Sequence, residues 1–226
     1  MLANRIVPTL LLSGGTLVKD VGFSKERVVG NPVQTTKVYG LREVDEIVIF
    51  DVSARDEFRP PDFATIKRMC GSCFLPTTVG GGIRDVSDAK KLIRECGADK
   101  IALGSRSWHL AKPLGSLIGR QSVVGVLSGR GDYEPHLENF GEIIVQSRGI
   151  DGTMGGYDVT LVRKTVRSVD VPVGASSGCG SFSDMDAVLS VGADAVAAGA
   201  LWQFTQNTPI EAKEYLEGKG WSVRIP

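Results

Sequence analysis

The chain has 226 residues, 42% of them hydrophobic and 23% charged, and its 26 basic and 26 acidic side chains give a net charge of zero. This length and composition are typical of a globular protein that buries a sizeable core, as one α/β barrel or as two small domains. The balanced charge, without a basic stripe, argues against a nucleic-acid or membrane partner. No apolar run resembles a signal peptide or a membrane-spanning segment, so we expect a cytoplasmic protein.

Short β-branched runs alternate with amphipathic stretches, which predicts βαβ units and a parallel sheet. In the first half the expected elements are strands 5–11, 46–51, 75–79 and 100–103 and helices 31–39, 62–70 and 86–95. In the second half they are strands 122–127, 142–146, 171–175 and 195–198 and helices 158–168, 183–191 and 210–219.

Two similar segments, 79–85 and 173–180, lie roughly 95 residues apart. Each ends a short apolar run that follows a proline, opens into an expected helix, and is followed by Gly-Ala-Asp and another apolar run. Such spacing indicates a half-barrel repeat. Eight strands in two equivalent halves predict a single (β/α)8 TIM barrel over residues 1–226, with half-barrels of about 1–118 and 119–226.

The connection between the fifth and sixth expected strands, residues 128–141, departs from this repeat. It is short and carries three glycines and a proline, whereas a crossover with its helix needs at least about ten to twelve residues. We therefore expect the fifth helix to be reduced or missing.

The cysteines and histidines give little support for a metal site, a redox site or a histidine-based catalytic mechanism. Cys70 and Cys73 form a CxxC with no second ligand pair, which favours small-residue packing over a metal or redox site. The two histidines, His109 and His136, are better explained by surface or loop positions. We expect no metal and no cofactor.

Several longer motifs resemble the cyclase subunit of imidazole glycerol phosphate synthase, over essentially the whole chain except 128–139. They lie at residues 1–8, 14–19, 45–46, 79–84, 97–100 and 151–158. In that family a glutaminase docks at the bottom of the barrel, and its ammonia travels through the barrel to a bisphosphate substrate at the top. The resemblance thus implies a glutaminase partner and a phosphorylated small molecule.

The family's two acid/base aspartates have no counterpart at the positions that the motifs match. Leu11 stands at the top of strand one and Leu127 at the top of strand five. Leucine cannot carry a proton, so the resemblance implies that the cyclase reaction is lost. Lys19 and Asp151 remain at matching positions and are the residual catalytic candidates. The alternative for Leu11 and Leu127 is that they simply fill the top layer of the barrel.

Glycine-rich turns at barrel tops offer backbone N–H groups to an anion, and the resemblance implies two such phosphate sites. The candidate residues are Gly81, Gly82, Gly104 and Ser105 in the first half, and Gly152, Ser177, Gly178, Gly199 and Ala200 in the second. Gly104 and Ala200 depart from the family pattern. The alternative is that these glycines only permit tight turns.

Four charged residues stand at strand starts, which converge at the N-terminal face of a closed barrel: Arg5, Glu46, Lys100 and Glu142. The resemblance implies that they form the gate through which ammonia enters. The alternative is that they only stabilise the bottom face.

The sequence segments at 10–15, 29–32 and 43–46 resemble a paralogous branch of the family more closely than the histidine enzyme. That branch is associated with acetamidino modification of bacterial surface sugars. In that branch the barrel and its glutaminase are thought to supply ammonia to a separate sugar amidotransferase. Three hypotheses follow: an ammonia-conducting barrel without cyclase activity, a true cyclase of histidine biosynthesis with acids relocated to Asp51, Asp151 or Lys19, and a scaffold or phosphate-binding barrel with a closed pore.

Overall fold

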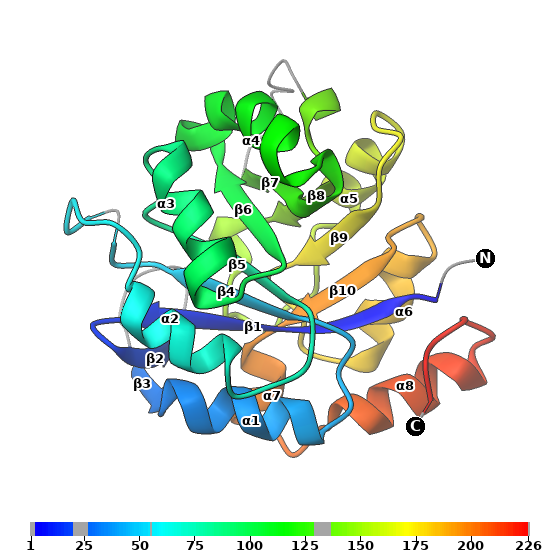
Figure 1. Ribbon diagram of the computed structural model, residues 1–226. Helices are drawn as coiled ribbons and strands as arrows, with labels where there is room; N and C mark the ends of the chain where they lie inside the picture. Colours follow the sequence, from blue (N-terminus) through cyan, green and yellow to red (C-terminus); the bar gives the residue numbers. More distant parts are fainter. Residues whose placement is uncertain (1–2, 20–26, 55, 129–136, 226) are drawn as a thin grey trace.

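Eight parallel strands follow one another around a closed barrel, which confirms the expected fold (Figure 1). In order around the barrel they are β1 (Arg5–Ser13), β4 (Ile47–Asp51), β5 (Thr77–Gly80), β6 (Lys100–Gly104), β7 (Val123–Ser128), β8 (Glu142–Gln146), β9 (Val173–Ser176) and β10 (Ala195–Ala198). The barrel closes where β10 pairs with β1, from Arg5 opposite Ala195 to Pro8 opposite Ala198. This computed structural model describes residues 3–19, 27–54, 56–128 and 137–225.

Helices surround the strands, and the six that the sequence predicts are present within a few residues of their expected bounds. They are α1 (Pro32–Leu41), α2 (Phe63–Cys70), α3 (Val86–Lys91), α5 (Val159–Val166), α6 (Phe182–Leu189) and α8 (Pro209–Gly218). Their starts were predictable because local side chains cap them. The carboxylates of Asp62 and Asp158 accept from the backbone N–H three residues ahead, at 3.0 and 2.9 Å.

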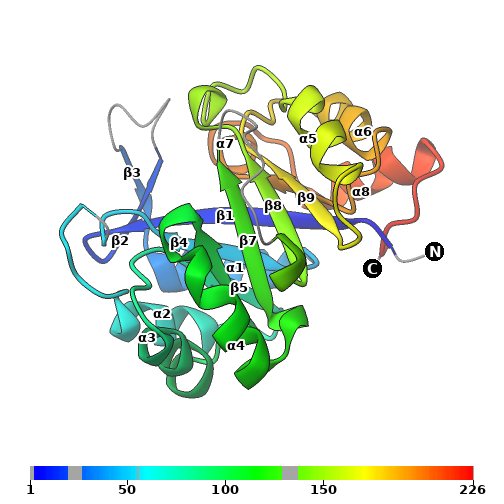
Figure 2. The same ribbon diagram turned by 90° about the horizontal axis from the view of Figure 1, so that it is seen from above.

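Two strands, two helices and a 3₁₀ turn were not expected. β2 (Thr16–Lys19) and β3 (Arg27–Gly30) extend the sheet beyond β1 as antiparallel strands, away from the end of β1 where the two termini lie (Figure 2). A 3₁₀ turn, Ser105–Leu110, runs into α4 (Ala111–Ile118), and α7 (Ala200–Phe204) follows β10. Pro113 and Gly115 weaken the helical pattern of α4 in the sequence. In the structure the helix packs against β7, α3 and the preceding 3₁₀ turn, and these tertiary contacts stabilise it.

The connection from β7 to β8 has one 3₁₀ turn, Leu137–Asn139, in its described part. Residues 129–136, including His136, lie outside the described residues. His109 is exposed on the 3₁₀ turn before α4.

The four cysteines are unpaired. Burial raises the pKa of Cys70 to about 11 and also raises the pKa of Cys73, so neither thiol is disposed to ionise as a redox or metal-binding thiolate. The described residues contain no group of three or more His, Cys, Asp or Glu side chains placed to hold a metal ion. Within the described part of the chain, no helix is long and apolar enough to cross a membrane.

Strand alternation divides the apolar side chains into two layers. The larger layer lies between the barrel and its helices and includes Ile6, Leu10 and Leu12 of β1. The smaller layer fills the barrel and includes Val7 and Leu11 of the same strand. Odd-numbered β1 residues therefore face the barrel interior, and this parity positions the site described below.

A buried ion pair fixes α8 to the bottom of the barrel. Lys213 is 2% exposed and donates to the Asp45 carboxylate at 3.1 Å and to the Glu43 carbonyl. The other Asp45 oxygen accepts from the Ile6 N–H at 2.7 Å. Removal of one member of such a pair leaves the other charge buried without a partner.

We expect Lys213→Met to lower the free energy of unfolding by about 3–5 kcal/mol, because the carboxylate of Asp45 then stays buried without its cation. Urea unfolding followed by circular dichroism measures this. The control is Lys112→Met at an exposed site on α4, where a change within about 0.5 kcal/mol is expected. Equal losses in the two variants would contradict this role of the ion pair.

Candidate functional site: a charged ring and a mouth pocket

The bottom of the barrel carries a closed ring of four charged side chains from four different strands or strand starts. Arg5 donates to Glu46 at 2.9 Å and to Glu142 at 2.6 Å. Lys100 donates to the same two carboxylates, at 2.9 and 2.8 Å. Each cation thus contacts both anions, so the four residues that the sequence places at strand starts lie together around the barrel axis.

The ring is largely withdrawn from water. Burial alone would raise the pKa of Glu142, but the charges and hydrogen bonds of Arg5 and Lys100 lower that pKa below its ordinary value. Burial would likewise lower the pKa of Arg5, yet Glu142 and Glu46 raise it. Glu142 and Arg5 are therefore each held in the charged form by their ring partners.

Above the ring, the hydroxyl of Thr78 on β5 donates to the Glu46 carboxylate at 2.5 Å. Thr78 is fully buried. Beyond it the barrel interior is lined mainly by apolar side chains, among them Val7, Val48 and Val124. The ring is thus followed, toward the top of the barrel, by the hydroxyl of Thr78 and then by the apolar interior.

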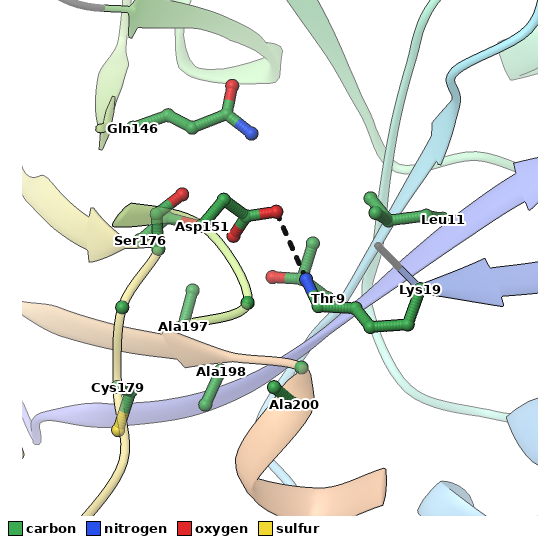
Figure 3. Close-up of a pocket in the computed structure, with 14 residues that line it drawn as sticks. Thr9, Leu11, Lys19, Gln146, Asp151, Ser176, Cys179, Ala197, Ala198 and Ala200 are labelled. Carbon is green, nitrogen blue, oxygen red and sulfur yellow. Dashed lines mark hydrogen bonds and ion pairs between the residues drawn. The ribbon is translucent and has the colours of Figure 1, made fainter. Parts of the chain in front are cut away.

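A pocket lies at the opposite, C-terminal end of the strands (Figure 3). Its polar side chains come from five parts of the chain: Thr9, Lys19, Gln146, Asp151, Ser176 and Ser177. Leu11 forms part of the wall, as do Cys179 and the backbone of Gly199. The pocket therefore gathers residues of β1, β2, β8, β9 and β10.

The two residual catalytic candidates meet in this pocket. The ammonium group of Lys19 lies 3.1 Å from the Asp151 carboxylate, and both side chains are more than nine-tenths buried. Nearby, burial raises the pKa of Cys179 to about 12, so this thiol is neutral and not a nucleophile. Lys19 and Asp151 are the charged groups available for binding or proton transfer in the pocket.

Two hydroxyls in the pocket have no hydrogen-bond partner among the described residues: those of Thr9 and Ser177. Ser177 has a φ of +75°, a conformation that disfavours residues with a Cβ. Its counterpart in the first half of the repeat is Gly81, with a φ of +92°. A serine at a glycine-like backbone position, with a buried free hydroxyl, marks the pocket as a place where a polar ligand would be held.

The two sets of phosphate candidates differ in the structure. All five second-half candidates, Gly152, Ser177, Gly178, Gly199 and Ala200, line the pocket. Those of the first half do not: a Cβ on Gly81 would meet the Asp51 carbonyl oxygen at 2.2 Å, and one on Gly82 would meet the Ala54 Cβ at 2.6 Å. Gly104 and Ser105 are exposed. Close packing of the neighbouring loop thus suffices to explain Gly81 and Gly82.

The two leucines at the acid/base positions face different layers. Leu11 points into the barrel and is 4% exposed, as expected for a residue of the top layer. Leu127 instead packs in the outer layer between barrel and helices. Because successive strand residues face opposite sides, the inward position at this end of β7 belongs to Ser128, whose hydroxyl donates to Gln146 at 3.3 Å. The expectation that Leu127 fills the barrel interior is therefore corrected.

Asp51 is the third candidate for a relocated acid, and its oxygens are already occupied. One accepts from the Ala54 N–H at 3.1 Å and the other from the Asp62 N–H at 2.8 Å. The guanidinium of Arg59 binds both oxygens, at 2.7 and 3.0 Å. This carboxylate anchors the loop between β4 and α2 and does not line the pocket.

Comparison with known proteins identifies the family. Residues 5–128 and 135–207 match the family model described as histidine biosynthesis protein. The imidazole glycerol phosphate synthase subunit HisF of Exiguobacterium sibiricum is 36% identical over 250 aligned residues, covering 99% of this chain and 100% of that protein. The chain belongs to this family. The HisF subunit of Clostridium botulinum strain Okra is 33% identical over 254 aligned residues and covers both chains fully.

Sequence reasoning missed several residues of this HisF-family site: Thr9, Gln146, Ser176 and Ser128 at the pocket end, and Thr78 at the ring. A parity signal was available, since Arg5, Thr9 and Leu11 share one face of β1, as Glu142 and Gln146 share one face of β8. What parity alone could not provide is the register between strands.

The lowered pKa of Glu142 gives a pH-dependent stability. A carboxylate whose pKa is lower in the folded state stabilises the protein above its unfolded pKa, close to 4.5, and this contribution is lost as pH falls through the folded value. We expect Glu142→Gln to lower the free energy of unfolding by about 3 kcal/mol at pH 7, and the difference from wild type to shrink below pH 4.5.

Denaturant unfolding between pH 3 and pH 8 checks this. The matched control is Glu217→Gln, an exposed carboxylate on α8, whose effect is expected to stay within about 0.5 kcal/mol across the range. A Glu142→Gln difference that is constant with pH would show that the ring does not depend on the ionised carboxylate.

Proposed function

We propose that this chain is the ammonia-conducting barrel of a glutamine-dependent system, one that docks a glutaminase and no longer carries out the cyclase reaction. The observation that carries this proposal is the contrast between the two ends of the barrel. The charged ring at the bottom is complete, while the inward positions at the top of β1 and β7 hold Leu11 and Ser128.

The bottom face supports the docking of a partner. Phe74, in the loop that leads into β5, is fully exposed, and Leu41 at the end of α1 is 76% exposed. Both lie at the end of the barrel where the strands begin, because Leu41 ends the helix before β4 and Phe74 precedes β5. Large exposed apolar side chains on one face are typical of a protein interaction site. HisF relatives are subunits of imidazole glycerol phosphate synthase, whose second subunit is a glutaminase, so a glutaminase is the proposed occupant.

The top of the barrel supports the loss of the cyclase reaction. General acid–base catalysis needs a group that ionises near neutral pH, and neither the Leu11 side chain nor the hydroxyl of Ser128 does so. The acceptor of the ammonia is then a separate enzyme. By its resemblance to the branch associated with acetamidino sugars, we propose a sugar amidotransferase that acts on precursors of a surface polysaccharide or glycan.

Two alternatives keep specific support. The buried pair of Lys19 and Asp151 favours a true cyclase of histidine biosynthesis with relocated acid/base groups, although Asp51 is excluded from that role by its contacts. The free hydroxyl of Ser177 favours a scaffold that binds a phosphorylated ligand. In the scaffold reading the ring is only structural, and Glu46→Ala would leave ammonia transfer from the glutaminase unchanged.

The first test supplies the purified protein with ammonium salt and the formimino-ribulosyl bisphosphate of the histidine pathway, and follows loss of that substrate. We expect no turnover for the wild type. The double variant Leu11→Asp with Ser128→Asp restores carboxylates at both inward positions, and we expect it to gain roughly 10²-fold over background.

The matched control is Leu11→Asp with Leu127→Asp, which places the second carboxylate in the outer apolar layer. It should gain no activity and should lower the melting temperature, because an unpaired charge replaces a buried leucine. Turnover by the wild type would reject the proposed loss of cyclase activity.

The second test concerns the bottom face. We expect Phe74→Asp to weaken binding of the glutaminase subunit by roughly tenfold or more, since an exposed aromatic at an interface often contributes at least 1.4 kcal/mol. Calorimetric titration and the stimulated glutaminase rate measure this. Leu117→Asp on α4, 52% exposed on the side of the barrel, is the control and should bind as the wild type does. Equal binding by all three proteins would contradict docking at this face.

A further inference from the structure

The barrel interior is asymmetric about β1. On the β4 side of that strand the inward side chains are Val48 and Phe50, whereas on the β10 side they are Ala195 and Ala197. Short side chains leave more space inside the barrel on the β10 side. Ala197 belongs to the wall of the pocket as well as to the inner apolar layer. The pocket therefore lies at the upper end of the more spacious side of the interior.

The enclosed part of the pocket is small. It leaves about 10 Å³ for the centre of a water-sized molecule. One molecule of that size needs roughly 10–15 Å³ on the same measure. The pocket thus has room for about one water-sized molecule, and a sugar phosphate would enter it only if the wall moved.

The charges of the pocket wall cancel. Among its described residues Lys19 is the one cation and Asp151 the one anion, and the two groups are paired at 3.1 Å. An anion beside Lys19 would also meet the carboxylate, and a cation beside Asp151 would also meet the ammonium group. A small molecule that is polar but neutral meets neither repulsion.

Thr9 and Ser177 offer hydrogen-bonding groups to such a molecule. The two side chains are only 8% and 5% exposed, and neither hydroxyl has a partner among the described residues. A buried hydroxyl without a partner destabilises the fold, and valine would fill the same space without a polar group. Because Thr9 lies at an inward position between Val7 and Leu11, its hydroxyl is better explained by a ligand than by packing.

The same wall contains a strong donor and further acceptors. A Cβ on Gly199 would lie 3.1 Å from the Thr9 carbonyl oxygen and 3.4 Å from the Lys19 ammonium nitrogen, which places that nitrogen near the Thr9 backbone (Figure 3). The side chain of Gln146 also lines the pocket. Ammonia accepts a hydrogen bond through its lone pair and donates through its hydrogens, so an ammonium donor and several oxygen acceptors suit it.

We propose that this pocket holds a single molecule of neutral ammonia at the exit of the barrel, with the Thr9 and Ser177 hydroxyls as its partners. Such a site rests on the proposed ammonia-conducting function, which brings a neutral molecule of this size to the mouth. The ammonium group of Lys19 disfavours a second cation beside it. The bound ammonia therefore stays unprotonated and keeps the lone pair with which it attacks an acceptor.

Titration of the free full-length chain with ammonium chloride tests this site, followed by the amide and methyl resonances of Thr9, Ala197 and Ala198. We expect saturable shifts. Because only the neutral form binds, the apparent dissociation constant for total ammonium should fall about tenfold from pH 7 to pH 8. Potassium chloride at the same ionic strength is the control and should leave these resonances in place. A constant that does not change with pH, the same shifts with potassium, or no shifts at all overturns the proposal.

The double variant Thr9→Val with Ser177→Gly removes both hydroxyls while it keeps the shape of Thr9 and permits the positive φ of Ser177. We expect the apparent dissociation constant for ammonia to rise roughly tenfold or more. The matched control is Thr36→Val on α1, a fully buried threonine whose hydroxyl donates to the Pro32 carbonyl at 2.8 Å, and it should bind as the wild type does. Equal binding by the wild type and the double variant would reject these two hydroxyls as the partners.

Inorganic phosphate separates this site from an anion site. We expect sodium phosphate to leave the Thr9 resonances in place, and saturable shifts with phosphate at lower concentrations than with ammonium would overturn the proposal. None of these measurements contains the glutaminase, so they are independent of the docking test. Ammonia binding by a chain that does not dock a glutaminase would reject the conducting function alone. Docking without ammonia binding would reject this site alone.

Discussion

The ring of Arg5, Glu46, Lys100 and Glu142 is the interaction on which the barrel base depends. Four charges withdrawn from water are tolerated only when each finds opposite charges nearby. Here each cation reaches both carboxylates, at distances between 2.6 and 2.9 Å, and that is possible only if β1, β4, β6 and β8 are held in register around a closed barrel. Pairing of β10 with β1 is thus coupled to the electrostatics of the base.

From this base upward, strand parity decides which residues can do chemistry. Residues of β8 face the interior in steps of two, from Glu142 in the ring through Ile144 in the apolar interior to Gln146 in the pocket. The same rule separates Leu127 from Ser128 on β7, one in the outer layer and one at the mouth. A shift of one residue along a strand therefore changes which side chain faces the mouth of the barrel, and so which groups there can donate or accept a proton.

The two halves of the barrel share loop and turn structure but differ in the residues that these loops and turns carry. Both halves have a β–α loop that packs on a glycine-rich turn, and both loops end at an aspartate cap. In the first half the turn holds Gly81 against the Asp51 backbone. In the second half the equivalent Ser177, with a buried hydroxyl that has no partner among the described residues, lines the same pocket as Lys19 and Asp151. The repeat thus supplies two similar frames, and the second half carries the described pocket.

The sequence by itself determined the barrel, because alternating strand and helix patterns, local helix caps and the repeated glycine turns are encoded within short windows. It also identified the four charges of the ring, since strand starts of a closed barrel converge at one face. It did not reveal α4, where Pro113 and Gly115 interrupt the helical pattern, nor the antiparallel strands β2 and β3. Only the tertiary structure decided that Lys19 pairs with Asp151, that Leu127 faces outward, and that Asp51 anchors a loop. These facts depend on register and on contacts between residues more than a hundred positions apart, or on loop packing, none of which a local pattern can specify.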